Sequence, residues 1–210
     1  MAGVTTWEIV RHRAAIAGRV KDAQTGQPLP GARIEITAGP PAFTGRLVLL
    51  AQQHGSRWET MAERPDRTRA AADGFFRFLD LPAGQYTLTG SLPGSGTRYG
   101  TATAQVTLTA DGQGNVSLGT VDLTLPVTTI QGRVSDAADA AIRLAEVRVE
   151  GSGERAWSDA QGKYVLSGVE VGARKLTVSA RGFETKSETV TLGQPGNVVT
   201  RDVTLTLSPP

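Results

Sequence analysis

One short pattern occurs twice in this sequence and limits the kinds of fold that the chain can adopt. In the first copy an Asp-Gly turn at residues 73–74 leads into the aromatic segment 75–78, and a Pro-Ala-Gly turn at 82–84 leads into segment 85–88. Asp-Gly favours tight turns because both residues tolerate positive φ, and aromatic side chains suit a half-buried strand. A second copy spans residues 161–176. The sequence therefore predicts two copies of one β unit.

The composition supports an all-β fold and excludes several classes of function. Only 5% of the residues are aromatic, whereas Gly and Pro number 25 and 11, which predicts many short strands and frequent turns. The formal net charge is +2, so nothing in the charge balance predicts binding to nucleic acid or to an anionic membrane. The absence of cysteine excludes disulfides, thiolate metal sites and thiol catalysis.

The beginning of the chain lacks the features of an export signal. Residues 1–9 contain neither a basic region nor an apolar run of signal-peptide length, and no stretch approaches the ~18 consecutive apolar residues of a membrane helix. We therefore expect synthesis in the cytoplasm without membrane insertion. Release as part of an extracellular particle stays open.

The spacing of the two copies reveals an insertion in the first. Gly18 matches Gly132 at a spacing of 114 residues, whereas Gly74 matches Gly162 at 88, so the first copy carries 26 additional residues. Because proline cannot donate to a strand ladder, Pro126 marks the expected boundary between domains 1–125 and 126–210. The linker is almost absent, which predicts end-to-end stacking of the domains with limited freedom.

The inserted segment, residues 43–64, has a helical rather than a strand pattern. Gly55 divides it into two short helices, Ser56 and Glu59 have the spacing of a capping box, and Pro65 ends the second helix. Helices this short are marginal alone in water, so their apolar stripes must pack on something. The candidate partner-binding residues are the apolar ones at helical spacing, Phe43, Leu47, Leu50, Trp58 and Met61. Packing of this stripe onto the first domain itself is the alternative.

The repeated motifs resemble the carboxypeptidase regulatory-like domain. The likeness rests on Ile-x-Gly-Arg-Val at residues 16–20, Pro-Leu-Pro-Gly-Ala at 28–32, and the turn–strand pattern of residues 73–88. It implies two tandem transthyretin-like (prealbumin-like) β-sandwiches, the first with a short helical insertion, and it implies no catalysis. In the second copy Arg174 stands where the first has Tyr86.

A second resemblance concerns the insertion. Residues 43–46 and 57–68 are similar to inserts of such domains encoded beside phage-tail-like contractile injection systems. Four arginines surround the apolar stripe, and they form either a basic rim or a solvated helix face: Arg57, Arg64, Arg67 and Arg69.

The sequence predicts no catalytic residue, no cofactor site and no metal site. His12 and His54 are the only histidines, and neither has a second ligand at the spacing that a zinc peptidase requires. The sequence also lacks a Gly-x-Ser-x-Gly elbow and a phosphate-binding loop. A hydrolase of unrecognised type is the least favoured interpretation.

Exposed aromatic rings could instead form a platform for stacking sugars. Packing in the core or at a seam is the competing explanation at this low aromatic content. The candidates are Trp7, Trp58, Trp157 and Tyr99.

These observations together favour a non-enzymatic structural or interaction module. The finer hypothesis is an accessory component of a large bacterial assembly such as a phage-tail-like contractile injection particle. Its expected partners are other protein subunits of that assembly, including copies of itself, and nucleic acid is not among them. A carbohydrate-binding or adhesin-like surface module is the alternative.

Overall fold

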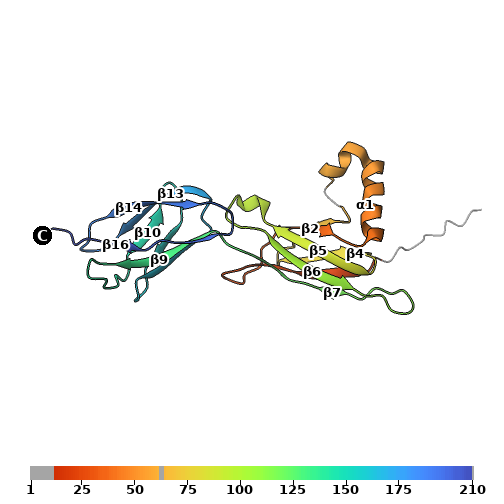
Figure 1. Cartoon of the computed structure of the whole chain (residues 1–210), viewed down its shortest axis with the longest axis horizontal. Helices are drawn as coiled ribbons and strands as arrows, with labels where there is room; N and C mark the ends of the chain where they lie inside the picture. The colour runs from red at the N-terminus through yellow and green to blue at the C-terminus, as the bar shows by residue number, and fades with distance from the viewer. Residues whose placement is uncertain (1–11, 62–63, 210) are drawn as a thin grey trace, which may run out of the picture.

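The computed structural model describes residues 12–61 and 64–209, which form two β-sandwiches joined end to end (Figure 1). The all-β fold with a helical insertion in the first sandwich is therefore confirmed. The strands of the first sandwich are β1 (Ala14–Asp22), β2 (Arg33–Ala38), β3 (Arg67–Arg69), β4 (Phe75–Leu79), β5 (Gly84–Ser91), β6 (Ala102–Leu108), β7 (Gly119–Thr120) and β8 (Leu123–Leu125).

The first sandwich consists of two four-stranded sheets. One has the order β4-β1-β7, with β8 also pairing with β1, and the other has the order β3-β2-β5-β6. Strand β1 runs antiparallel to β4 but parallel to β7 and β8. Strands β3 and β4 are therefore edge strands, each paired with another strand on one side only within the described residues.

The second sandwich repeats this topology. Its sheets have the orders β12-β9-β15, with β16 also pairing with β9, and β11-β10-β13-β14. Its strands are β9 (Thr129–Ser135), β10 (Glu146–Val149), β11 (Arg155–Trp157), β12 (Lys163–Ser167), β13 (Gly172–Ser179), β14 (Lys186–Leu192), β15 (Val198–Thr200) and β16 (Val203–Thr204).

The repeated turn–strand pattern places apolar side chains in each core by strict alternation. After the Asp-Gly turn, Phe76 and Phe78 of β4 point inward and are buried, while Arg77 between them is exposed. Tyr164 and Leu166 of β12 occupy the same two buried positions in the second core. Two separate cores result, one from residues 15–125 and one from residues 130–205.

The glycine of each Ile-x-Gly-Arg-Val motif allows two backbones to approach closely. A Cβ atom on Gly18 would lie 1.7 Å from the carbonyl oxygen of Val121, and one on Gly132 would lie 1.9 Å from that of Arg201. The residue after each carbonyl, Asp122 or Asp202, accepts a hydrogen bond from the backbone N–H that follows the glycine, at 2.8 Å in both domains.

The insertion consists of α1 (Pro41–His54) followed directly by the 3₁₀ helix η1 (Gly55–Thr60). Two helical segments meeting at Gly55 agree with the sequence prediction, although α1 begins two residues earlier, with proline at its first turn. The predicted capping box of Ser56 and Glu59 is wrong. No residue separates the two helices, so Ser56 lies inside η1, whose first turn has no side-chain cap.

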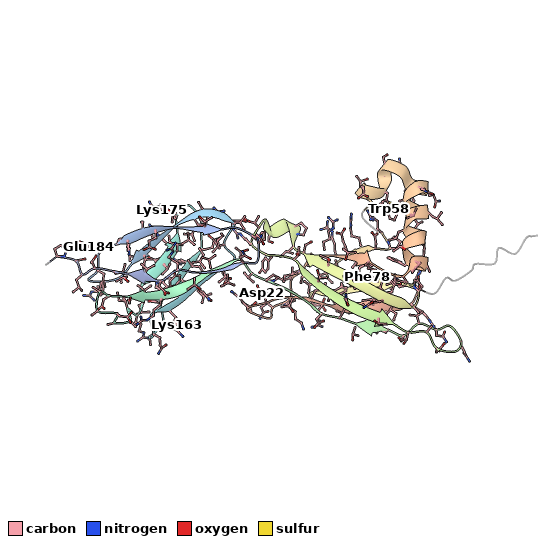
Figure 2. The ribbon with its side chains drawn as sticks, in the orientation of Figure 1. Asp22, Trp58, Phe78, Lys163, Lys175 and Glu184 are labelled. Carbon is pink, nitrogen blue, oxygen red and sulfur yellow. The ribbon has the colours of Figure 1, made fainter. Side chains whose placement is uncertain are left out.

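Hydrogen bonds between side chains join the two sandwiches directly. Gln24 of the first domain donates to Thr129 Oγ1 at 2.7 Å and contacts Ser167. Glu170 accepts a hydrogen bond from the Thr97 backbone N–H at 2.9 Å. Figure 2 shows Asp22 close to this junction. The short η2 helix (Pro93–Ser95) also lies at the junction.

Candidate functional site

The insertion stands away from the first sandwich at the end that is distant from the second domain (Figure 1). It leaves the sheet after β2 and returns at β3, the edge strand paired with β2. In the second domain a tight turn of residues 150–154 makes the same connection between β10 and β11. The sandwich therefore closes without the insertion, which makes this segment the first place to look for function.

The base of α1 packs on the first core. Phe43 is 2% exposed, and its ring meets Tyr86 edge-on with the centroids 5.5 Å apart. Leu47 is half-buried against the same core. For these two predicted partner-binding residues the structure thus shows packing within the chain. A partner contact for either remains a prediction.

The outer part of the insertion has a different arrangement. Trp58 is 7% exposed, and Leu50 and Met61 are half-buried. The large apolar side chains that α1 exposes are instead Val48 and Leu49, at 56% and 67%. Their exposure depends on how α1 is rotated about its axis, which helical spacing alone does not give.

Arg64 fixes the segment that returns from the insertion to the sheet. Its guanidinium lies 4.3 Å from the centre of the Trp58 ring and makes two hydrogen bonds to the Asp66 carboxylate, at 2.6 and 2.9 Å. The hydrogen bonds that Arg64 donates to Asp66 are the main reason that the pKa of Arg64 is raised. Asp66 is buried, and its carbonyl accepts the N–H of Ile36 in β2. Trp58 is thereby coupled to the sheet.

A cleft of about 770 Å³ lies between the base of the insertion and the two edge strands β3 and β4. Figure 2 shows Phe78 of β4 beside the base of α1 and Trp58 farther out in the insertion. The cleft is lined by His12, Phe43, Arg46, Arg64, Pro65, Arg67, Thr68, Arg69, Arg77, Phe78, Leu79, Asp80 and Leu81.

The arginines of this cleft differ in how they are compensated. Arg64 pairs with Asp66, and Arg67 pairs with Glu35. Burial of the Glu35 carboxyl favours its neutral form, but hydrogen bonds from Arg33 and Arg67 outweigh this effect and lower its pKa. The remaining three have no ion-pair partner among residues 12–61 and 64–209: Arg46, Arg69 and Arg77.

Among residues 12–61 and 64–209, Asp80 is the only carboxylate that lines the cleft. It accepts the backbone N–H of Arg13 at 2.9 Å and contacts the His12 ring. These contacts lower its pKa, and the charge of Arg46 lowers it further. Sequence reasoning identified Arg64, Arg67 and Arg69 but missed Arg46 and Arg77. Comparison of the repeats could have found Arg77, because valine stands at the matching position 165.

The remaining candidates for chemistry are far less concentrated. His54 stacks on Trp58 with the ring centres 6.2 Å apart. In the part of the chain that the structure describes, no three potential metal ligands gather, and no helix is long and apolar enough to cross a membrane.

The three sugar-stacking candidates that the structure describes do not form one platform. Trp58 is buried, and Tyr99 donates its hydroxyl to Asp22 at 2.8 Å near the domain junction. Trp157 is 51% exposed on β11, with Arg155 5.2 Å from its ring centre. Trp7 lies outside the described residues.

The family sequence model of the carboxypeptidase regulatory-like domain matches this chain twice, over residues 15–124 and 129–206. The chain belongs to the carboxypeptidase regulatory-like domain family. Each match coincides with one of the two sandwiches, and the first match runs across the insertion. A search of curated protein sequences finds no matching relative.

Several solved structures resemble this tandem of carboxypeptidase regulatory-like domains at low identity. The shaft pilin SpaA from Lactobacillus rhamnosus GG is 13% identical, with 94% of this chain and 99% of that chain covered and a TM-score of 0.40. The minor pilin GBS52 from Streptococcus agalactiae is 13% identical, with 93% of this chain and 96% of that chain covered and a TM-score of 0.30. A chain of a mutant type II cohesin–X-dockerin complex from Acetivibrio cellulolyticus is 16% identical, with 38% of this chain and 52% of that chain covered and a TM-score of 0.30. The match therefore spans about half of that last chain.

Proposed function

We propose that this protein is a non-enzymatic structural and interaction module whose insertion and adjoining cleft form its principal binding surface. The observation that carries the proposal is the asymmetry of the repeats. The same family domain occurs twice, but only the first copy carries a segment that its sandwich does not require, and that segment builds an arginine-lined cleft. The partner is another protein subunit.

The finer proposal is that this subunit belongs to a large bacterial assembly of the phage-tail-like contractile injection type. It is supported by the resemblance of the insertion to inserts encoded beside such systems. The elongated shape with the insertion at one end also suits a component that connects parts of a larger particle (Figure 1).

The deciding experiment is recovery of the tagged protein from its native host by size-exclusion chromatography. We expect the chain to elute with a large complex. A variant in which residues 37–66 are replaced by a copy of residues 150–154, with Tyr86→Arg to match Arg174, should elute alone while unfolding cooperatively. Elution of the unaltered protein as a free monomer under all conditions would contradict the proposal.

Trp157 supports carbohydrate binding as a second candidate, because its ring is half exposed on an edge strand beside Arg155. A glycan array would then give signals that Trp157→Ala abolishes and Trp58→Ala retains. An array without signals, or signals that Trp157→Ala leaves intact, would exclude this function for Trp157.

A further inference from the structure

The cleft beneath the insertion has a strong excess of positive charge for a protein whose net charge is +2. Within the described part of the chain, five arginines and one carboxylate line it. Two of the arginines are neutralised by Asp66 and Glu35, which leaves Arg46, Arg69 and Arg77 for an external anion. Guanidinium groups bind carboxylates through two parallel hydrogen bonds, so this arrangement suits carboxylate side chains.

The sandwich fold does not require these arginines. The 88-residue spacing between the repeats places Trp157 of β11 at the position of Arg69 and Val165 of β12 at the position of Arg77. Both edge strands are complete in the second domain without a basic residue at either position. The two arginines therefore belong to the cleft rather than to the fold.

Two neighbouring edge strands, β3 and β4, border the cleft and favour an extended ligand. Among the described residues, strand β4 pairs only with β1 and strand β3 only with β2. The outer backbone groups of Phe75 already bond Asp73 and Ala71, so the part of the β4 edge that can receive another strand is Arg77–Leu79. A peptide added to such an edge gains backbone hydrogen bonds and presents alternate side chains to the pockets beside it. Outward-facing Arg77 lies on β4 itself.

The cleft also has an apolar part, lined by Phe43, Phe78 and Leu81. The aromatic rings there are buried to 97% or more, so they present no open ring face on which a sugar could stack. A polyanion that carries only phosphate or sulfate groups would leave this apolar part unused. A peptide in which acidic and apolar side chains alternate would contact both the arginines and the apolar part of the cleft.

We propose that this cleft binds an extended acidic peptide segment of a partner protein, which adds to the edge of β4 and directs its carboxylates to Arg46, Arg69 and Arg77. The proposal rests on the interaction function proposed above and names the chemistry of the partner. It also assigns a different role to two of the predicted apolar residues: Phe43 lines the cleft, and Trp58 packs against Arg64, which lines it.

The test is fluorescence anisotropy with a labelled peptide of alternating glutamate and valine. We expect the full-length protein to bind it at low ionic strength, with weaker binding as salt screens the charges. The double variant Arg69→Gln, Arg77→Gln should bind at least tenfold more weakly. The matched control, Arg143→Gln with Arg181→Gln, removes two exposed arginines of the second domain and should bind like the unaltered protein.

Four further measurements make the outcome decisive. The charge-reversed variant Arg69→Glu, Arg77→Glu should gain binding to a lysine–valine peptide, which a misfolded variant would not. A glutamate–valine peptide N-methylated at alternate residues should lose binding, and equal binding would overturn strand addition. Equal affinity for a glutamine–valine peptide, or binding of a heparin tetrasaccharide but not of the acidic peptide, would overturn the acidic-peptide assignment.

The acidic-peptide assignment of the cleft and the proposed assembly function can be contradicted independently. A protein that travels in a large complex but does not bind the glutamate–valine peptide overturns the cleft assignment alone. A protein that binds this peptide through Arg69 and Arg77 but travels alone overturns the assembly role alone.

Discussion

A single position in the two repeats shows how the insertion shaped the first domain. Tyr86 donates its hydroxyl to the carbonyl of Pro82 at 2.8 Å, and Arg174, its counterpart, donates to the carbonyl of Glu170 at 2.9 Å. The same turn is thus held by two unrelated side chains. Tyr86 is fully buried under Phe43 of α1, whereas Arg174 remains partly open to solvent. The tyrosine suits the domain that has a helix to cover it.

This contact gives a prediction for Phe43. Phe43→Ala removes a buried ring and leaves a cavity above Tyr86, so we expect the first domain to lose roughly 3 kcal/mol of unfolding free energy. Differential scanning calorimetry should show its transition at a lower temperature. Leu49→Ala, at a side chain 67% exposed on the same helix, serves as the control and should not move the transition. An unchanged midpoint for Phe43→Ala would show that α1 does not stabilise the core.

The close backbone approach at Gly18 gives a second prediction. An alanine Cβ would lie 1.7 Å from the Val121 carbonyl oxygen, so β1 and the β8 segment must separate. We expect Gly18→Ala to destabilise the first domain by about 3 kcal/mol in urea unfolding. Gly45→Ala is the control, since nothing lies within 4 Å of its added Cβ and α1 should gain helix propensity. Similar unfolding curves for the two variants would refute the steric argument.

At the scale of elements, the insertion is held at its outer end by few contacts, and Arg64 is central to them. Arg64→Lys keeps the charge but loses the paired hydrogen bonds to Asp66 and the stacking on Trp58. We expect backbone amides of residues 55–61 to exchange with deuterium roughly tenfold faster, a change of ~1.4 kcal/mol in local opening. Hydrogen-exchange mass spectrometry measures this directly.

The control for this variant is Arg57→Lys, at an exposed arginine of η1 without an ion-pair partner among the described residues. Its exchange should match that of the unaltered protein, and strands β2 and β5 should stay protected in both variants. Faster exchange across β2 and β5 in Arg64→Lys would mean that the insertion and the first sandwich open together.

The strands could be predicted from the sequence because their pattern is local. The Asp-Gly turn at residues 73–74 and the alternation that follows it determine which side chains of β4 face the core. The cleft could be predicted only in part, because it depends on contacts across the fold. Arg77 and Arg69 line the same cleft because their strands, in different sheets, lie at the same edge of the sandwich. Arg46 lines it because of the direction in which α1 leaves the sheet. Helical spacing grouped Phe43 with Trp58 but did not show that both turn inward.

At the scale of the whole molecule, the junction between the sandwiches depends on a charged group. Hydrogen bonds from the Thr97 hydroxyl and N–H, together with Arg98, lower the pKa of Glu170. Because the pKa of Glu170 is lowered in the joined state, its carboxylate stabilises the junction at pH values above the ordinary glutamate pKa of about 4.3. That stabilisation is lost as pH falls through the lowered value.

We therefore expect the joined sandwiches to loosen in acid. Small-angle X-ray scattering should show a broader distribution of interatomic distances below about pH 4 than at pH 7. Glu170→Gln should give the broader distribution already at pH 7. Glu184→Gln, far from the junction (Figure 2), should behave like the unaltered protein. A Glu170→Gln profile identical to that of the unaltered protein at both pH values would exclude this carboxylate as the junction's pH-sensitive group.

The parallel pairing of the first and last strands in each sandwich has a mechanical consequence. Strand β1 runs beside β8, and β9 runs beside β16, each pair in the same direction. A force that pulls the two ends of the molecule apart draws the members of each pair in opposite directions along their length. Their hydrogen bonds are then loaded together in shear instead of opening one after another. When the two ends are pulled apart in a single-molecule force experiment, we expect a high unfolding force, with each sandwich unfolding in one abrupt step.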